Sequence, residues 1–290
     1  MDSKMAAVYA NMQEILAALP AEYLIVDLWG VIHDGVYPYP GVKETLERLK
    51  QANKKILFLS NAPRRAQRAV ETLTRMDISG EYYHFVLTSG EVTHDFVKKK
   101  YTSGSYYYIG PEKDAGLLAD LPLTRTADAG KAKFAVVTGY DNDDSPYDEK
   151  KKDLDACIRH KLPLLCANPD FEVVRQNGVR VPCAGIIAAE YESMGGEVMY
   201  FGKPHEAVYN RARELFRNPP PEKILAIGDA LETDIKGANG QGIRSVLVTC
   251  GIMAEKLGIE PGDMPAREVL KGLYDQEKIA ATAAIPAFRF

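Results

Sequence analysis

The chain has 290 residues and a formal net charge of −4, from 36 Lys and Arg against 40 Asp and Glu that are spread along it. No basic face large enough to follow a phosphate backbone is evident, so we expect no nucleic-acid partner. At roughly 150 residues per domain, the length predicts two domains.

The cysteines and the hydropathy pattern indicate where in the cell the protein is expected. No run of about 18 uninterrupted apolar residues exists, so we expect no transmembrane helix and no membrane partner. The stretch over residues 5–19 is interrupted by polar residues and predicts an amphipathic helix rather than a signal peptide. The cysteines show no CxxC spacing and are interpreted as free thiols of a cytoplasmic protein: Cys157, Cys166, Cys183 and Cys250.

The first part of the chain alternates strands and helices. Apolar runs predict strands over residues 23–29, 55–60 and 84–89, and helices are expected over 41–53 and 64–76. This βαβ alternation predicts an α/β fold with a Rossmann-like parallel sheet as its core.

A second domain is expected within the first. Ser60 and Lys203 are separated by 143 residues, more than the next strand and helix require, and this interval has its own βα pattern. We therefore predict a core domain of residues 1–89 and 186–290 and a large inserted α/β cap domain of residues 90–185. The strand over 197–204 is expected to return the chain to the core.

Polar residues follow several of the core strands. Asp27 follows the buried apolar run of residues 23–26, Ser60 and Asn61 stand where the second strand ends, and Asp229 ends a later strand over residues 223–229. The carboxyl ends of strands in open α/β sheets bind ligands, and paired carboxylates suit Mg²⁺, which prefers oxygen ligands. Taken singly, a Ser-Asn pair is also typical of a helix cap.

Together these motifs resemble the haloacid dehalogenase (HAD) superfamily. The resemblance rests on Asp27 in DLWG, Ser60 in LFLSNAP, Lys203 in YFGKP, and Asp229 in AIGDALETD. The strings CANPD, CAGIIAA and FGKP are similar to class IIA, the branch of the N-acetylglucosamine-phosphate phosphatases.

The resemblance implies a role for each site residue. Asp27 would be the nucleophile, and Mg²⁺ would be held by Asp27, Asp229 and the backbone carbonyl of Trp29, with Asp234 as a neighbouring partner. Ser60 and Asn61 would bind the phosphoryl oxygens. Lys203 would contribute a compact positive charge that holds nucleophile and phosphoryl group together.

The resemblance also implies that Asn168 and Asp170 of the cap approach the substrate. An Asn-Pro-Asp turn needs no function, however, and that alternative stays open.

Trp29 departs from the pattern of the phosphatases, which carry a second Asp at this position as general acid and base. Loss of such a group costs roughly 10²- to 10⁴-fold in rate, and indole offers only an N–H donor. His33 and Asp34 are the nearest titratable residues that could replace it, although His33 also fits an ordinary loop position.

These observations predict a Mg²⁺-dependent hydrolase of a small phosphomonoester, such as a sugar phosphate, that works through an aspartyl-phosphate. The alternatives are a phosphometabolite-binding protein with little turnover and a dehalogenase-like hydrolase. The tyrosines at 106–108 of the cap could form a homodimer contact.

Overall fold

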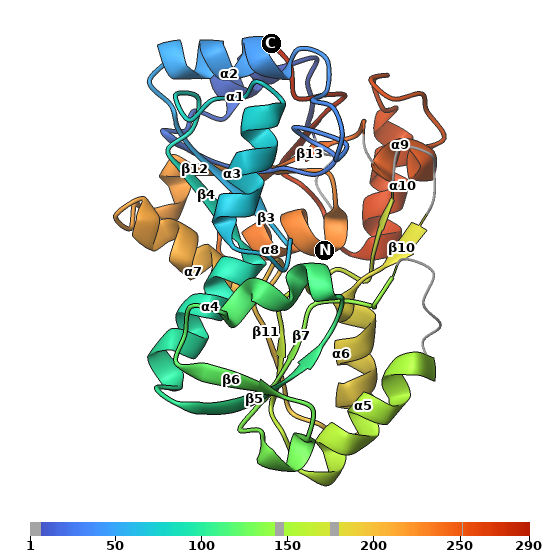
Figure 1. Cartoon of the computed structure of the whole chain (residues 1–290). Helices are drawn as coiled ribbons and strands as arrows, with labels where there is room; N and C mark the ends of the chain where they lie inside the picture. Colours follow the sequence, from blue (N-terminus) through green and yellow to red (C-terminus); the bar gives the residue numbers. More distant parts are fainter. Residues whose placement is uncertain (1–6, 143–147, 175–179, 251) are drawn as a thin grey trace. The chain divides into compact units, whose positions relative to one another are not determined.

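The structure is a computed structural model that describes residues 7–142, 148–174, 180–250 and 252–290 (Figure 1). The chain forms two compact units, and each is described by itself. The first unit comprises Met1–Ser60, Val70–Leu87 and Tyr209–Phe290, and the second comprises Asn61–Ala69 and Thr88–Val208.

The first unit is built on a seven-stranded sheet with the order β1-β14-β13-β12-β2-β3-β4. Within this sheet, β2 (Tyr23–Asp27) pairs in parallel with β3 (Lys55–Ser60) on one side and with the central strand β12 (Ile224–Gly228) on the other. Both faces of the sheet are covered, which explains why these strands read as continuous apolar runs. The remaining strands are β1 (Ala7–Val8), β4 (Phe85–Thr88), β13 (Arg244–Val248) and β14 (Ala283–Ile285).

Helices flank this sheet (Figure 1). In α2, Val42, Leu46 and Leu49 follow a helical period and all three are buried, so the helix packs one apolar face inward. The helices of the first unit, or shared between the units, are α1 (Met12–Ala18), α2 (Val42–Gln51), α3 (Ala66–Arg75), α7 (Glu206–Leu215), η3 (Pro221–Lys223), η4 (Leu231–Ile235), α8 (Lys236–Gly240), α9 (Ile252–Leu257) and α10 (Arg267–Glu277).

The second unit contains a parallel five-stranded sheet with the order β11-β8-β7-β5-β6 and a two-stranded antiparallel ribbon. The sheet strands are β5 (Gly104–Ile109), β6 (Leu123–Thr126), β7 (Ala135–Val137), β8 (Leu164–Cys166) and β11 (Val198–Tyr200), and the ribbon strands are β9 (Glu172–Val174) and β10 (Arg180–Pro182). Its helices are α4 (Ser89–Lys100), η1 (Glu112–Leu118), η2 (Ala129–Lys131), α5 (Asp148–Arg159) and α6 (Ala184–Ser193). Leu154 of α5 and Ile187 of α6 join the same buried cluster as Val137 of the sheet.

The α/β class, with a parallel Rossmann-like core sheet and a second α/β domain, is confirmed. The chain returns to the first unit later than expected, because β11 pairs with β8 in the second sheet and only Tyr209 begins the return. The sequence predicts a helix over residues 190–194 before that strand, and in the structure this helix begins earlier, at Ala184. The sequence also predicts a helix over residues 147–160, and its first residue, Tyr147, lies outside the described residues.

The tyrosines expected at a dimer contact are mostly inside the second unit. Tyr106 and Tyr108 are buried, and the Tyr108 hydroxyl contacts Thr138 Oγ1 at 2.7 Å. The Tyr107 hydroxyl donates to Asp153 of α5. Burial of Tyr106 and Tyr108 argues against a dimer contact through their side chains, and the homodimer itself stays a prediction.

Within the described ranges, no helix combines the length and the apolar character that a membrane span requires.

Candidate active site

Three buried carboxylates of the first unit lie together at the carboxyl edge of its sheet. Asp27 ends β2, Asp229 directly follows the neighbouring strand β12, and Asp234 lies in η4. One ligand oxygen from each lies within 4.8 Å of the other two, and each residue is 5–7 % exposed. Burying like charges so close together is unfavourable unless a cation neutralises them. This all-oxygen set fits Mg²⁺.

Gly30 provides the space that Asp229 occupies. It has a φ of +80°, and a Cβ at this position would lie 1.9 Å from Asp229 Oδ2. The Gly30 amide donates to the carbonyl oxygen of His33 at 3.0 Å, which fixes the turn. No separate signal in the sequence indicates this contact, because a glycine after a strand is typical of any turn.

Asp234 is held next to the same strand end. Its Oδ2 accepts from the Ala230 amide at 3.3 Å, and the Tyr209 hydroxyl donates to its carbonyl oxygen at 3.2 Å. A Cβ at Gly228 would lie 2.1 Å from Asp234 Cγ, so the side chain packs directly on the end of β12. Asp234 thus joins the cluster, in the place that the resemblance implies.

The Trp29 side chain packs within the loop that follows β2. Its indole lies against the Cα of Gly35, where a Cβ would meet the ring at 2.4 Å, and it contacts the His33 ring edge-on with centroids 6.1 Å apart. Trp29 is half-buried in this position. The tryptophan therefore has a packing role in the loop, apart from any ligand role of its backbone carbonyl.

His33 and Asp34, the candidates to replace the missing acid, are both used to shape this loop. His33 Nδ1 accepts from the Gly35 amide at 3.0 Å, and burial lowers the pKa of His33 to about 4. The residue is thus neutral at physiological pH and holds no imidazolium proton to donate. Asp34 Oδ1 accepts from the amides of Val36 and Tyr37 at 2.8 and 2.7 Å, as in an Asx turn.

Ser60 ends β3, next to the strand that carries Asp27, since Asp27 and Leu59 are paired in register. Ser60 is half-buried at this edge. Its place beside the carboxylate cluster agrees with the expected site, and its binding of a phosphoryl oxygen stays a prediction.

In the second unit, Asn61 contacts the main chain of Lys203. Asn61 Oδ1 accepts from the Lys203 amide at 2.7 Å, and Asn61 Nδ2 donates to the Lys203 carbonyl oxygen at 3.0 Å. Nδ2 also donates to Asp170 Oδ1 at 2.7 Å. The structure thus joins three residues that the sequence singled out separately, but it uses the Asn61 side chain inside the protein.

The segment that contains Asn168 and Asp170 forms a turn. Asn168 Oδ1 accepts from the Asp170 amide at 3.2 Å, and the Gly185 amide donates to the Asp170 carbonyl oxygen at 3.0 Å. The structure therefore contains the Asn-Pro-Asp turn that the sequence left open as an alternative. A contact of either residue with substrate stays a prediction.

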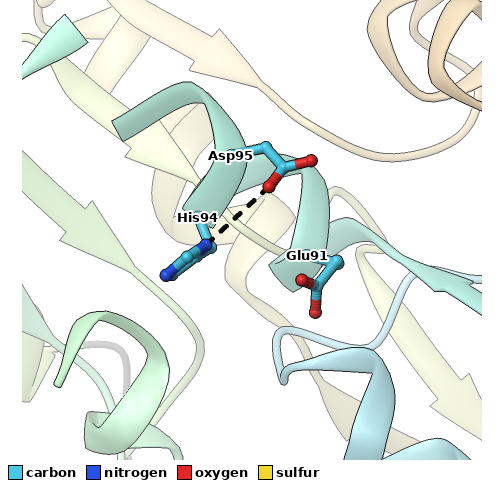
Figure 2. Close-up of side chains that lie close together, drawn as sticks. All are labelled: Glu91, His94 and Asp95. Carbon is cyan, nitrogen blue, oxygen red and sulfur yellow. Dashed lines mark ion pairs between the residues drawn. The ribbon is translucent and has the colours of Figure 1, made fainter. Parts of the chain in front are cut away.

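A second group with metal-ligand chemistry lies on α4 of the second unit. Glu91, His94 and Asp95 project from neighbouring turns of this helix, with one ligand atom of each within 4.8 Å of the others (Figure 2). His94 Nδ1 lies 3.9 Å from Asp95 Oδ1, and His94 Nε2 lies 3.0 Å from Asp120 Oδ1.

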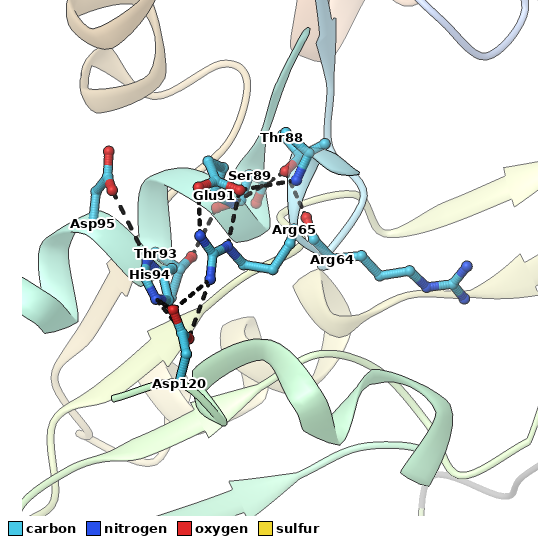
Figure 3. A network of polar contacts seen from close by, with 10 residues as sticks. Arg64, Arg65, Thr88, Ser89, Glu91, Thr93, His94, Asp95 and Asp120 are labelled. Atoms are coloured by element: carbon cyan, nitrogen blue, oxygen red, sulfur yellow. Dashed lines mark hydrogen bonds and ion pairs between the residues drawn. The ribbon is translucent and has the colours of Figure 1, made fainter. Parts of the chain in front are cut away.

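Arg65 already binds Glu91 of this group and the neighbouring Asp120 (Figure 3). Its guanidinium donates to both oxygens of Glu91 at 2.9 and 3.0 Å and to both oxygens of Asp120 at 3.2 Å. Burial opposes ionisation of Glu91, but these bonds to Arg65 and the Ala66 amide leave its pKa lowered. We interpret the group as a salt-bridge network that holds the segment after Asn61 against α4. The sequence did not indicate this network.

Comparisons with protein-family models and with known proteins show what this chain is similar to. A family model described as haloacid dehalogenase-like hydrolase matches residues 24–123, and a HAD-hydrolase-like model matches residues 200–284. Chronophin of Bos taurus is 30% identical over 249 residues, covering 80% of this chain and 82% of its own length. The D-glycerol 3-phosphate phosphatase of Mycobacterium tuberculosis is 25% identical over 272 residues, covering 92% and 74%.

Solved structures agree with the sequence comparisons. A haloacid dehalogenase-like hydrolase from Brucella suis 1330 superimposes with a TM-score of 0.80 at 27% identity, covering 97% of this chain and 100% of that one.

Proposed function

The chain belongs to the class IIA branch of the haloacid dehalogenase superfamily of hydrolases, and from that premise we propose that it hydrolyses a small phosphomonoester with the help of Mg²⁺. The observation that carries the proposal is the buried cluster of Asp27, Asp229 and Asp234 at the ends of adjacent parallel strands. A relative named as a phosphatase of D-glycerol 3-phosphate supports a small phosphorylated metabolite, such as a sugar phosphate, as the substrate.

The proposed metal site uses Asp27, Asp229 and the carbonyl oxygen of Trp29, with Asp234 beside them. Bound Mg²⁺ would neutralise the charges of nucleophile and phosphoryl group. Gly30 leaves room for the Asp229 carboxylate, and the Trp29 indole packs on Gly35 in the loop that carries the carbonyl.

The proposed reaction has two steps. In the first, a carboxylate oxygen of Asp27 attacks phosphorus, the bond to the ester oxygen breaks, and the alcohol leaves with a proton from solvent. In the second, water attacks the aspartyl-phosphate, which releases inorganic phosphate and restores Asp27. Ser60 would bind a phosphoryl oxygen, and Lys203 would balance the phosphoryl charge; the role of Lys203 is carried over from the sequence resemblance.

Trp29 supports a second candidate function, in which the protein binds phosphorylated metabolites with little turnover. Neither the indole nor the neutral His33 can protonate an alkoxide leaving group. The dehalogenase alternative is less well supported, because displacement of halide from carbon needs no cluster of metal-binding carboxylates.

We also propose a cytoplasmic location without a nucleic-acid or membrane partner. The four cysteines are buried and are not joined in disulfides, as suits a reducing compartment.

The test is phosphate release from a panel of sugar phosphates, glycerol phosphate, nucleotides and p-nitrophenyl phosphate, with Mg²⁺ and with chelator. Release that needs Mg²⁺ would establish the hydrolase. Saturable binding of Mg²⁺ and orthophosphate without any release would instead establish the binding protein.

A further inference from the structure

The Asn61 side chain holds the backbone of Lys203 at both of its polar atoms. The carboxamide oxygen accepts from the Lys203 amide at 2.7 Å, and the carboxamide nitrogen donates to the Lys203 carbonyl oxygen at 3.0 Å. Both residues are buried, at 5% and 4% exposure. Two hydrogen bonds to one residue's main chain fix its position and its peptide orientation.

The hydrogen-bond pattern also fixes how the carboxamide is turned. The Lys203 amide can only donate, so the carboxamide oxygen must face it, and the NH₂ group then faces Asp170, whose Oδ1 lies 2.7 Å from Asn61 Nδ2. Both N–H donors of the carboxamide are then used inside the protein. No donor of this side chain is left for a phosphoryl oxygen, which argues against the side-chain ligand role expected for Asn61.

Neighbouring residues pack closely around these bonds. A Cβ at Gly202 would lie 2.4 Å from Asn61 Oδ1 and 2.6 Å from the Pro169 ring. The residue before Lys203 thus has to be small for the carboxamide to reach the Lys203 amide. The glycine at position 202 is thus a second feature that permits the hydrogen bond between Asn61 and Lys203.

The segment that begins at Asn61 is itself fixed to α4. The Thr88 hydroxyl donates to the Arg64 carbonyl oxygen at 2.5 Å, and the Gly90 amide donates to the Ala62 carbonyl oxygen at 3.1 Å. Arg65 and Glu91 add the paired bonds of the salt-bridge network (Figure 3). Asn61 therefore begins a segment that several hydrogen bonds hold against α4.

We propose that Asn61 is a positioning residue for Lys203, oriented by Asp170, and that it does not bind substrate through its side chain. This inference rests on the proposed function, because it assumes that Lys203 acts on the phosphoryl group. Misplacing a charged group by about 1 Å can lower a rate about 100-fold, which sets the scale of the expected effect.

The test is a double-mutant cycle of Asn61→Ala and Lys203→Ala, read as kcat/KM for phosphate release. Asn61→Ala alone is expected to lower kcat/KM by roughly 10- to 100-fold. In the double variant it should add nothing to the loss caused by Lys203→Ala, since no ammonium group is left to position. Independent, multiplicative losses would overturn the proposal and return Asn61 to a direct substrate contact.

A second pair of variants tests the role of Asp170. Asn61→Asp places two carboxylates at hydrogen-bond distance and should reduce activity more than Asn61→Ala. Adding Asp170→Asn restores a donor and an acceptor across this contact and should recover part of the loss. No recovery in a folded double variant would contradict the proposed orientation.

The control is Asn239→Ala in the first unit, which removes a carboxamide bond of 2.9 Å to the Ala280 carbonyl oxygen. This variant should keep the wild-type kcat/KM, and melting temperatures show that each variant is folded. If the wild-type protein releases no phosphate, the proposed function fails on its own. The same cycle is then read from orthophosphate affinity by calorimetry, with the same non-additivity expected.

Discussion

The carboxylate of Asp229 lies so close to Gly30 that a Cβ there would come within 1.9 Å of Asp229 Oδ2. The loop after β2 and the end of β12 therefore fit together only because residue 30 has no side chain. Gly30 also has a positive φ of +80°, which is unfavourable for other residues. The geometry of the proposed metal site thus depends on a residue without functional groups.

Gly30→Ala is expected to displace Asp229 and to weaken Mg²⁺ binding at least 10-fold, besides a backbone cost of about 1 kcal/mol in folding stability. Calorimetric titration with Mg²⁺ measures the affinity. Gly242→Ala is the matched control, because Gly242 has a φ of +66° but a Cβ there would meet no atom of the described residues within 4 Å. Equal Mg²⁺ affinity in both variants would contradict the importance of the Gly30 contact.

Trp29→Asp is expected to supply the missing general acid and to raise the rate with alkyl phosphates by about 10²-fold. The rate with p-nitrophenyl phosphate should rise less, because p-nitrophenolate leaves without protonation. Steady-state rates with glycerol phosphate and p-nitrophenyl phosphate measure the difference. The variant also loses the indole contact with Gly35 and should melt at a lower temperature. If the rate with glycerol phosphate rises no more than the rate with p-nitrophenyl phosphate, residue 29 does not act as the general acid.

His33 should make the protein less stable in mild acid. Its pKa is about 4 in the folded chain, against 6.5 for an ordinary histidine, because burial disfavours the charged form. Between these values the unfolded chain binds a proton that the folded chain does not, so the free energy of unfolding falls as pH decreases from 6.5 to 4. The full loss is roughly 3 kcal/mol.

Urea unfolding at pH 7, 5.5 and 4.5 measures this effect. His33→Asn keeps an acceptor for the Gly35 amide but cannot titrate in this range, so it should lose less stability between these pH values than the wild type. Parallel losses in the two proteins would show that other groups cause the acid sensitivity.

Arg65 and Glu91 should be energetically coupled. Two bonds of 2.9 and 3.0 Å join them, and both side chains are mostly buried. A double-mutant cycle of Arg65→Gln and Glu91→Gln, read by urea unfolding, should give a coupling of about 1–3 kcal/mol. The exposed pair Glu232 and Lys236 is the control, with an expected coupling below about 0.5 kcal/mol. Similar values for the two pairs would contradict a structural role of the network.

Much of the fold could be predicted because its central strands are continuous apolar runs that end in polar residues. Asp27, Ser60 and Asp229 were placed at strand ends in this way, and the structure has them there. The short strand β11 was assigned to the wrong sheet, since three apolar residues carry no signal of which neighbour they pair with. The 3₁₀ and π segments and the short ribbon strands were hard to predict for the same reason.

The candidate site was predicted by residue type but not by contact. The sequence motifs selected Asn61, Asp170 and Lys203. Only the structure shows that the Asn61 carboxamide forms its hydrogen bonds with the other two residues. The contact of Gly30 with Asp229 joins residues 199 positions apart in the chain, and no local pattern reports it. Tertiary contacts of this kind decide whether a polar residue binds a ligand or supports a neighbour.

The central claim is that Asp27 is the nucleophile of a Mg²⁺-dependent phosphate release. The most direct measurement compares this release in the wild type and in Asp27→Asn, with Asp77→Asn as the control at an exposed, left-handed position that asparagine tolerates. We expect Asp27→Asn to release no measurable phosphate and Asp77→Asn to match the wild type. Turnover that persists in folded Asp27→Asn would contradict the account.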